Sequence, residues 1–161
     1  MIRALLKPSR FMAALLSAAL LSFAGTASSA DKPAASIPPD KLVQPADFAT
    51  QLKDASVRKP LMLHVGFKTM FDQAHIPGSE YAGPGNTGAG LQALRDRVAS
   101  LPKNTAIMIY CGCCPWSRCP NMAAAYDALI ELRFTNVKGM QINDNFGADW
   151  VDKGFPTAKS K

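Results

Sequence analysis

Apolar side chains recur at helical spacing in three parts of the chain. Residues 45–52 predict a short helix, because Phe48 and Leu52 lie one turn apart. Residues 91–101 predict an amphipathic helix that ends before a proline, and residues 121–133 predict a second one. The apolar stripes of these two helices consist of Leu91, Leu94, Val98 and Leu101 in the first, and of Met122, Ala125, Leu129 and Leu132 in the second.

Short, almost wholly apolar stretches alternate with these helices. Residues 61–65 and 105–110 predict two buried strands, and residues 136–140 predict a third, shorter one. A strand without polar alternation is typical of the middle of a parallel sheet that is covered on both faces. The segment 81–90 contains four glycines and a proline, which predicts a flexible, solvent-facing loop. Trp150 is the expected packing anchor of the last segment. The alternation predicts an α/β fold, a small parallel-sheet sandwich flanked by helices, with right-handed crossovers.

The beginning of the chain has the pattern of an export signal. Three basic residues are followed by an apolar run at 11–23 and then by small residues. Ser28 and Ala30 occupy the −3 and −1 positions of a signal-peptidase site before Asp31. A membrane anchor is the alternative, but the apolar run is about half of the roughly 20 residues that a membrane-spanning helix needs. We therefore expect residues 1–30 to be a signal peptide and the protein to be periplasmic or secreted.

Cleavage at this site defines the mature chain. Residues 31–44 hold three prolines, with a fourth at Pro45, and predict a tether, which places the domain at residues 45–158. Loss of residues 1–30 removes three of the 18 basic residues and none of the 12 acidic ones, so the net charge falls from +6 to +3. No run of lysine or arginine follows that would track a phosphate backbone, which argues against nucleic acid as a partner. We expect a monomer with no transmembrane segment in the mature chain.

The four cysteines form a tight cluster in the sequence. Cys111, Cys113, Cys114 and Cys119 all fall within nine residues. Disulfides between such close positions restrict the unfolded chain very little, so a stabilising disulfide framework does not explain the cluster. Reactivity or metal binding explains it better.

Four segments resemble rhodanese domains. Residues 75–79 read His-Ile-Pro-Gly-Ser, like the His-Ile-Pro-Gly-Ala segment of that family, and Tyr110-Cys111 resembles the strand end that carries its catalytic cysteine. Residues 133–137 and 150–156 are similar to its Gly-Phe-x-Asn-Val segment and its closing Trp-x-x-x-Gly-x-Pro segment. The resemblance extends over nearly the whole mature chain and implies a rhodanese-like domain.

The chain departs from the family pattern at three places. Many rhodanese domains carry Asp-Val-Arg after the first strand, whereas residues 64–66 read His-Val-Gly. The Gly-Gly before the last tryptophan is replaced by Asn145 and Phe146. The loop from Cys111 to Cys119 is longer than the usual Cys-x-x-Gly-x-x-Ser and contains three further cysteines.

The resemblance implies that Cys111 is the catalytic nucleophile of a sulfurtransferase. It would take the outer sulfur of a small sulfur-containing anion such as thiosulfate, carry it as a persulfide and pass it to a thiol acceptor, without a cofactor. A loop between a strand and a helix suits this chemistry, because the loop amides and the helix N-terminus stabilise an anion. The expected substrate-binding residues are Gly112, Trp116, Ser117 and Arg118, with Arg118 placing a positive charge beside the substrate.

The three further cysteines support two other functions. Cys113, Cys114 and Cys119 are candidate redox or resolving residues, because Cys111 or Cys114 could pair reversibly with Cys119 in a thiol–disulfide protein. A disulfide between the adjacent residues 113 and 114 would be strained, and the helix entrance is expected to lower the pKa of Cys119. Three or four soft thiolates also suit copper(I) or zinc, although the spacing is not a standard zinc pattern and leaves the metal open.

Three other polar residues fit structural roles. His75 is expected to close a turn beside Pro77. His64 stands at a strand end and is expected to be a half-buried imidazole with its hydrogen bonds satisfied. Asn121 is expected to cap the helix that follows it.

Overall fold

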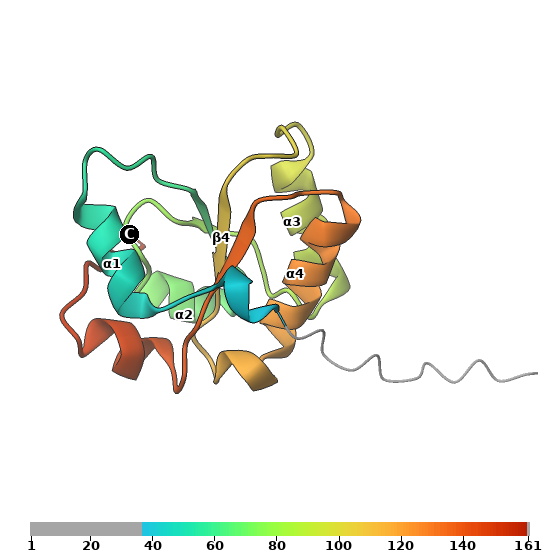
Figure 1. The fold of residues 1–161 in the computed structure, drawn as a ribbon. Coiled ribbons are helices and arrows are strands. Elements are labelled where there is room, and N and C mark those ends of the chain that lie inside the picture. Colours follow the sequence, from blue (N-terminus) through green and yellow to red (C-terminus); the bar gives the residue numbers. More distant parts are fainter. Residues whose placement is uncertain (1–36, 161) are drawn as a thin grey trace, which may run out of the picture. The chain divides into compact units, whose positions relative to one another are not determined.

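The computed structural model describes residues 37–160. The expected signal peptide and residues 31–36 of the expected tether lie outside the described residues. The described chain forms a five-stranded parallel sheet in the order β1-β5-β4-β2-β3, with helices on both faces (Figure 1). The predicted fold class is confirmed.

Helices and strands alternate along the chain as the hydrophobic pattern predicts. The strands are β1 (Leu42–Val43), β2 (Leu61–His64), β3 (Glu80–Tyr81), β4 (Ile107–Tyr110) and β5 (Val137–Met140). The helices are α1 (Pro45–Lys53), α2 (Lys68–Gln73), α3 (Gly88–Val98) and α4 (Pro120–Glu131), with 3-10 helices η1 (Pro39–Lys41) and η2 (Trp116–Arg118) and a π-helical turn η3 (Gly147–Val151). The three predicted helices and the three predicted strands are all present, with shifted ends.

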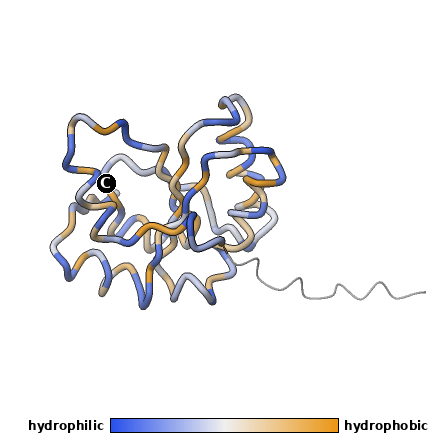
Figure 2. Tube along the Cα trace, viewed as in Figure 1, coloured by the Kyte–Doolittle hydropathy of each residue, from blue (hydrophilic) through white to orange (hydrophobic). Residues whose placement is uncertain are grey.

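β4 is the central strand and is buried on both faces. Ile107 and Ile109 belong to the core cluster that packs against α3 and α4, whereas Met108 and Tyr110 belong to the cluster on the α1 and η3 side. Figure 1 shows these two layers on opposite sides of β4, and Figure 2 shows hydrophobic residues along the central strands and polar residues in the outer loops. Because each face meets a helical layer, the side chains of β4 are apolar apart from the hydroxyl of Tyr110, which is hydrogen-bonded to Ser79 and to the amide of Ile76.

Trp150 anchors the layer formed by α1 and η3. Its side chain is fully buried, and its indole Nε1 donates to the carbonyl of Pro156 at 2.8 Å. Its ring stacks on Phe146 with centroids 5.9 Å apart and meets the edge of Phe155 at 5.1 Å. The predicted role of Trp150 as a packing anchor is confirmed.

The expected tether is wrong for residues 37–44, which belong to the fold. β1 pairs in parallel with β5, with Leu42 opposite Gly139, and Ile37 is only 2% exposed in the core. A strand of two residues among prolines leaves no periodic signal in the sequence. The domain therefore begins before Pro45, and β1 covers one edge of the sheet.

The flexible loop expected at residues 81–90 is also wrong. Ala82, Gly83 and Gly85 are buried, and the amide of Gly85 donates to the carbonyl of Val65 at 2.9 Å. A Cβ on Gly83 would lie 2.5 Å from the carbonyl carbon of Val65, so only glycine allows the two backbones to approach so closely. Gly83, Gly85 and Gly90 serve close packing, and of the four glycines only Gly88 faces open space.

The helices of the described residues are short. α2 gave no signal in the sequence, because six residues with Phe71 as the buried side chain make too short a pattern. Within residues 37–160 no helix has the length and apolar character needed to span a membrane.

Candidate functional site

The site begins where β4 ends. Cys111 directly follows β4 and is 2% exposed, on the α3 and α4 side of the sheet. The chain then passes through η2 and enters α4, whose N-cap is Cys119. Two backbone hydrogen bonds hold the loop against the segment that follows β5: Trp116 donates to Ile142 at 2.8 Å, and Phe146 donates to Gly112 at 3.2 Å. The carboxyl end of the central strand therefore delivers Cys111 into a fixed loop.

The loop folds back and brings the cysteine sulfurs together. The Sγ of Cys113 lies 3.4 Å from that of Cys111, 3.1 Å from that of Cys114 and 4.0 Å from that of Cys119. All four are free thiols, since a disulfide bond is about 2.05 Å long. The three-dimensional cluster that the sequence could only suggest is thus present, with Cys113 in contact with each of the others.

Asn121 reaches into the cluster from α4. Its side chain is 1% exposed, and Nδ2 donates to the sulfurs of Cys111 and Cys113 at 3.7 and 3.8 Å. Its Oδ1 accepts from the amide of Asn86 at 3.1 Å, which fixes the amide orientation by tying it to the buried glycine-rich segment. The expected capping role is therefore wrong: Asn121 lies inside α4, and it is a donor to the thiols.

The thiols around Cys111 hold their protons. A hydrogen bond to Cys111 and burial raise the pKa of Cys119, and burial, followed by contact with Cys114, raises the pKa of Cys113 to about 12. Burial also raises the pKa of Cys114. The expectation of a lowered pKa at Cys119 is wrong, because its sulfur is buried against another thiol and the N-terminal amides of α4 offset this only in part.

His64 lies beside Cys111, an approach that its position at a strand end near the same sheet edge left open. A Cβ on Gly66 would lie 2.8 Å from the Sγ of Cys111 and 2.9 Å from Cε1 of His64, so glycine at this position lets the two side chains share one space. His64 is 2% exposed and its Nδ1 has no hydrogen-bond partner among the described residues. The expectation of a half-buried, satisfied imidazole is therefore wrong.

Burial keeps the imidazole of His64 neutral. Desolvation, and to a smaller extent the charge of His75, lowers the pKa of His64 to about 4. Its ring packs among Phe71, Tyr81 and Tyr110, with centroid distances of 5.5, 6.2 and 5.0 Å. The neutral ring offers one N–H donor and one acceptor nitrogen to its surroundings. One signal in the sequence indicated a role for His64. It ends the strand β2, which pairs with β4, and it stands where many rhodanese domains carry the Asp of Asp-Val-Arg.

His75 has the structural role predicted for it. Its Nδ1 lies 2.7 Å from the carbonyl oxygen of Phe71, and its ring stacks on the Phe71 ring at 4.0 Å. Its backbone amide donates to the carbonyl of Ala158 at 2.9 Å, which ties the end of the chain to the turn.

A cavity of about 250 Å³ opens next to the loop. Gly112 and His64 form part of its wall, and the other lining residues are Met70, Gln73, Ala74, Asn145, Phe146, Gly147 and Val151. A larger cavity of about 490 Å³ lies at the amino ends of the strands, near Lys59 and Asn136, and no cysteine lines it. Neither cavity is lined by a cysteine, but the smaller one is the better candidate substrate site, because His64 and Gly112, the residue after Cys111, border it.

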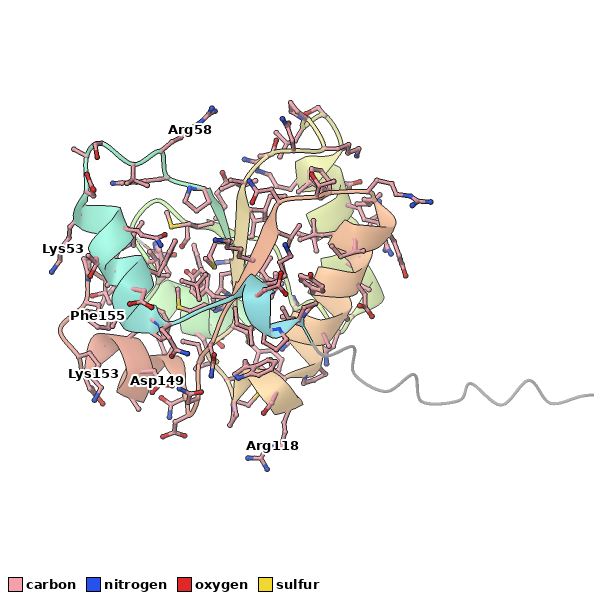
Figure 3. All side chains as sticks on the ribbon, viewed as in Figure 1. Lys53, Arg58, Arg118, Asp149, Lys153 and Phe155 are labelled. Carbon is pink, nitrogen blue, oxygen red and sulfur yellow. The ribbon has the colours of Figure 1, made fainter. Side chains whose placement is uncertain are left out.

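The structure separates the expected substrate-binding residues. Gly112 lines the cavity, and Trp116 is half-buried and packs against the core. Ser117 and Arg118 are exposed on η2, and Figure 3 shows the Arg118 side chain extending away from the fold. The positive charge of Arg118 lowers the pKa of Cys114, but by less than burial raises it.

Known structures share this architecture, although no family model and no curated protein matches the chain. A rhodanese-like domain from Anabaena sp. matches with a TM-score of 0.56 at 19% identity, over 74% of this chain and 80% of that chain. A rhodanese-like domain protein from Staphylococcus aureus matches with a TM-score of 0.51 at 14% identity, over 75% of this chain and 99% of that chain.

A third match has a different description. A protein of unknown function from Rhodopseudomonas palustris, titled a possible tyrosine phosphatase, has a TM-score of 0.54 at 16% identity, over 73% of this chain and 84% of that chain. The five-stranded parallel sheet flanked by helices agrees with the fold of the two rhodanese-like matches. The protein described here therefore has the rhodanese-like fold.

Proposed function

We propose that this protein is a sulfurtransferase-type protein that carries a sulfane sulfur as a persulfide on Cys111. The observation that carries the proposal is the position of Cys111, which lies at the carboxyl end of the central strand within reach of a side-chain donor. The Nδ2 of Asn121 donates to its sulfur at 3.7 Å. This donor stabilises a negative charge on the attacking sulfur and on the persulfide that replaces it.

Sulfur transfer takes two displacement steps at this sulfur. The Cys111 thiolate attacks the outer sulfur of a small anion such as thiosulfate, a new S–S bond forms, and the S–S bond of the donor breaks so that sulfite leaves with the electron pair. A thiolate acceptor then attacks the outer sulfur of the persulfide, and the Cys111 sulfur leaves as a thiolate. The neutral His64 ring borders the cavity in which the donor anion would lie.

The test is turnover of thiosulfate and cyanide to thiocyanate by the reduced protein. Cys111→Ser is expected to abolish thiocyanate formation, because serine offers no sulfur to accept the sulfane atom. Peptide mapping after thiosulfate treatment should find the mass of one added sulfur on Cys111, with the other three cysteines as internal references. Thiocyanate formation by folded Cys111→Ser, or an added sulfur found only on other cysteines, would contradict the proposal.

A reversible disulfide is the second candidate function. The sulfurs of Cys111, Cys113 and Cys119 all lie within 4.8 Å of one another, so a small movement of the loop brings a pair to bonding distance. In exchange with an external disulfide, the protein pair is oxidised and the external disulfide is reduced to two thiols. Thiol titration should then find two fewer reactive thiols after treatment with oxidised glutathione, restored by reductant. Four reactive thiols under all conditions would argue against it.

We also propose that the protein acts after export. The proposal rests on the basic, apolar and small-residue segments of residues 1–30, which lie outside the described residues. N-terminal sequencing of the protein purified from its own cells should give Asp31 as the first residue. An intact Met1 in the active pool would contradict export by cleavage at this site.

A further inference from the structure

Three cysteine sulfurs form a compact triangle at the carboxyl end of β4. The Sγ atoms of Cys111, Cys113 and Cys119 lie within 4.8 Å of one another, with two of the separations at 3.4 and 4.0 Å. They come from the strand end, the middle of the loop and the N-cap of α4. Within residues 37–160, this is the group of cysteine, histidine and acidic side chains close enough to share one metal ion.

The size of the triangle matches a three-coordinate metal. A metal–sulfur bond is about 2.3 Å long, and three sulfurs in a plane around one ion are then about 4.0 Å apart. The Cys113–Cys119 separation of 4.0 Å matches this value, and the Cys111–Cys113 separation of 3.4 Å is shorter by about half an ångström, which a small side-chain rotation supplies. The protein therefore holds three soft ligands at nearly the spacing that such a site needs, without a disulfide among them.

The surroundings of the triangle exclude hard cations. Calcium and magnesium need several oxygen ligands, and no carboxylate of the described residues belongs to the group. Asn121 turns its Nδ2 toward the sulfurs and uses its Oδ1 to accept from the amide of Asn86, so its oxygen is engaged elsewhere. The donor set consists of thiolates, which select soft ions.

The ligand number favours copper(I) over zinc. Structural zinc takes four protein ligands, and the triangle supplies three, with Cys111 and Cys119 almost fully buried at 2% and 1% exposure. We infer that Cys111, Cys113 and Cys119 form a binding site for one copper(I) ion. Cys114 lies outside the triangle: its sulfur contacts Cys113 at 3.1 Å but does not belong to the group of three.

The site contains groups that stabilise the excess negative charge of the complex. Three thiols lose their protons to solvent as copper(I) binds, and the complex then carries two net negative charges. Asn121 donates to two of the sulfurs, and the backbone amide of Met122, in the first turn of α4, donates to Cys119. The helix N-terminus adds to this stabilisation.

This copper site goes beyond the proposed sulfur transfer, and the two uses of Cys111 exclude each other. A sulfur bound to copper(I) cannot attack a sulfur donor, whereas a persulfide on Cys111 changes the ligand set. The two proposals therefore stand or fall separately: metal binding is measured on the reduced protein without any sulfur donor, and sulfur transfer is measured with a copper chelator present.

The test uses the reduced full chain under anaerobic conditions, titrated with copper(I) against the chromophoric chelator bicinchoninate. One copper(I) per chain is expected, with a thiolate-to-copper absorption band in the near ultraviolet. Cys113→Ser should weaken binding by at least about 100-fold. The adjacent Cys114→Ser is the matched control and should leave the affinity within about threefold, since its sulfur lies outside the triangle.

Three results would overturn the inference. They are a chelator that keeps all the copper in the presence of the wild-type protein, equal losses of affinity in the two serine variants, and tighter retention of zinc than of copper(I) in a direct competition. A circular dichroism spectrum of each variant shows whether it is folded. If Cys113→Ser does not fold, Cys119→Ala and alkylation of the native thiols decide the outcome by the same copper count.

Discussion

The buried neutral histidine makes the stability of the domain depend on acid. In the unfolded chain a histidine titrates near its ordinary value of 6.5, whereas in the fold the pKa of His64 is lowered to about 4. Between these values the unfolded state binds more protons than the folded state, so the free energy of unfolding rises with pH. Acidification through this window therefore destabilises the protein, and the full effect is present once the pH falls below the folded pKa.

The magnitude follows from the two pKa values. Lowering the pH from about 7.5 to about 5 should cost roughly 2 kcal/mol of stability through His64 alone, out of about 3.4 kcal/mol at still lower pH. His64 is 2% exposed, so solvent does not screen the effect. The groups that face its ring are Phe71, Tyr81 and Tyr110, none of which titrates in this range.

The assay is urea unfolding of the metal-free, reduced protein at both pH values, compared with His64→Asn and His64→Phe. His75 is present in all three proteins, so the difference between wild type and variant isolates His64. The variants should lose roughly 2 kcal/mol less than the wild type on acidification. Equal pH dependence in the wild type and both variants, or an imidazole signal of His64 that titrates near its ordinary pKa, would refute a buried neutral ring.

Variants at four further positions test the packing of the fold and the donor to Cys111. Gly66→Ala places a Cβ 2.8 Å from the Sγ of Cys111 and should lower the free energy of unfolding, measured in urea, by about 1–3 kcal/mol. Gly88→Ala is the control: its Cβ meets open space, so the free energy of unfolding should stay the same or rise by up to about 1 kcal/mol. Equal losses in the two variants would contradict the space shared by Cys111 and His64. Trp150→Ala should cost about 3–5 kcal/mol because the ring is fully buried, and Trp150→Phe should cost less than half of that. Asn121→Asp keeps the acceptor oxygen but replaces the donor to Cys111 with a negative charge, so iodoacetamide should alkylate Cys111 at least several times more slowly; an unchanged rate would mean that the donor does not act on this sulfur.

The sequence predicts the parts of the fold whose signal is local and repeated. β4 is buried at every position because both of its faces are covered, and α4 shows an apolar stripe that its neighbours bury. β1 escapes prediction because two residues form it and its partner is almost a hundred positions away. The segment 82–87 was misinterpreted because glycine and proline mark a change of chain direction but do not show whether water or Val65 lies against it.

In the candidate site, too, the features with a local signal could be predicted and those that depend on the folded surroundings could not. The position of Cys111 follows from the strand that precedes it, and the clustering of the four cysteines is visible in their spacing. The protonation of Cys119 could not be predicted, because a helix entrance lowers the pKa of a thiol only if no buried neighbour opposes it. His64 was underestimated for the same reason: the meeting of two strand ends and the missing side chain at Gly66 are properties of the sheet.

The pairing of β1 with β5 has a consequence for how the chain folds during synthesis. Gln44, directly after β1, donates to Gln141, directly after β5, across 97 positions of sequence. The ribosome releases β1 first, so this strand waits without a partner until almost the whole domain has emerged, and its closure is the most non-local contact in the sheet. Before β5 is made, neither β1 nor β4 has its partner on that side of the sheet. A chain halted before residue 137 would therefore present the buried strand β4 as an open sheet edge. The last strand to be made is thus the one that shields the centre of the sheet from other chains.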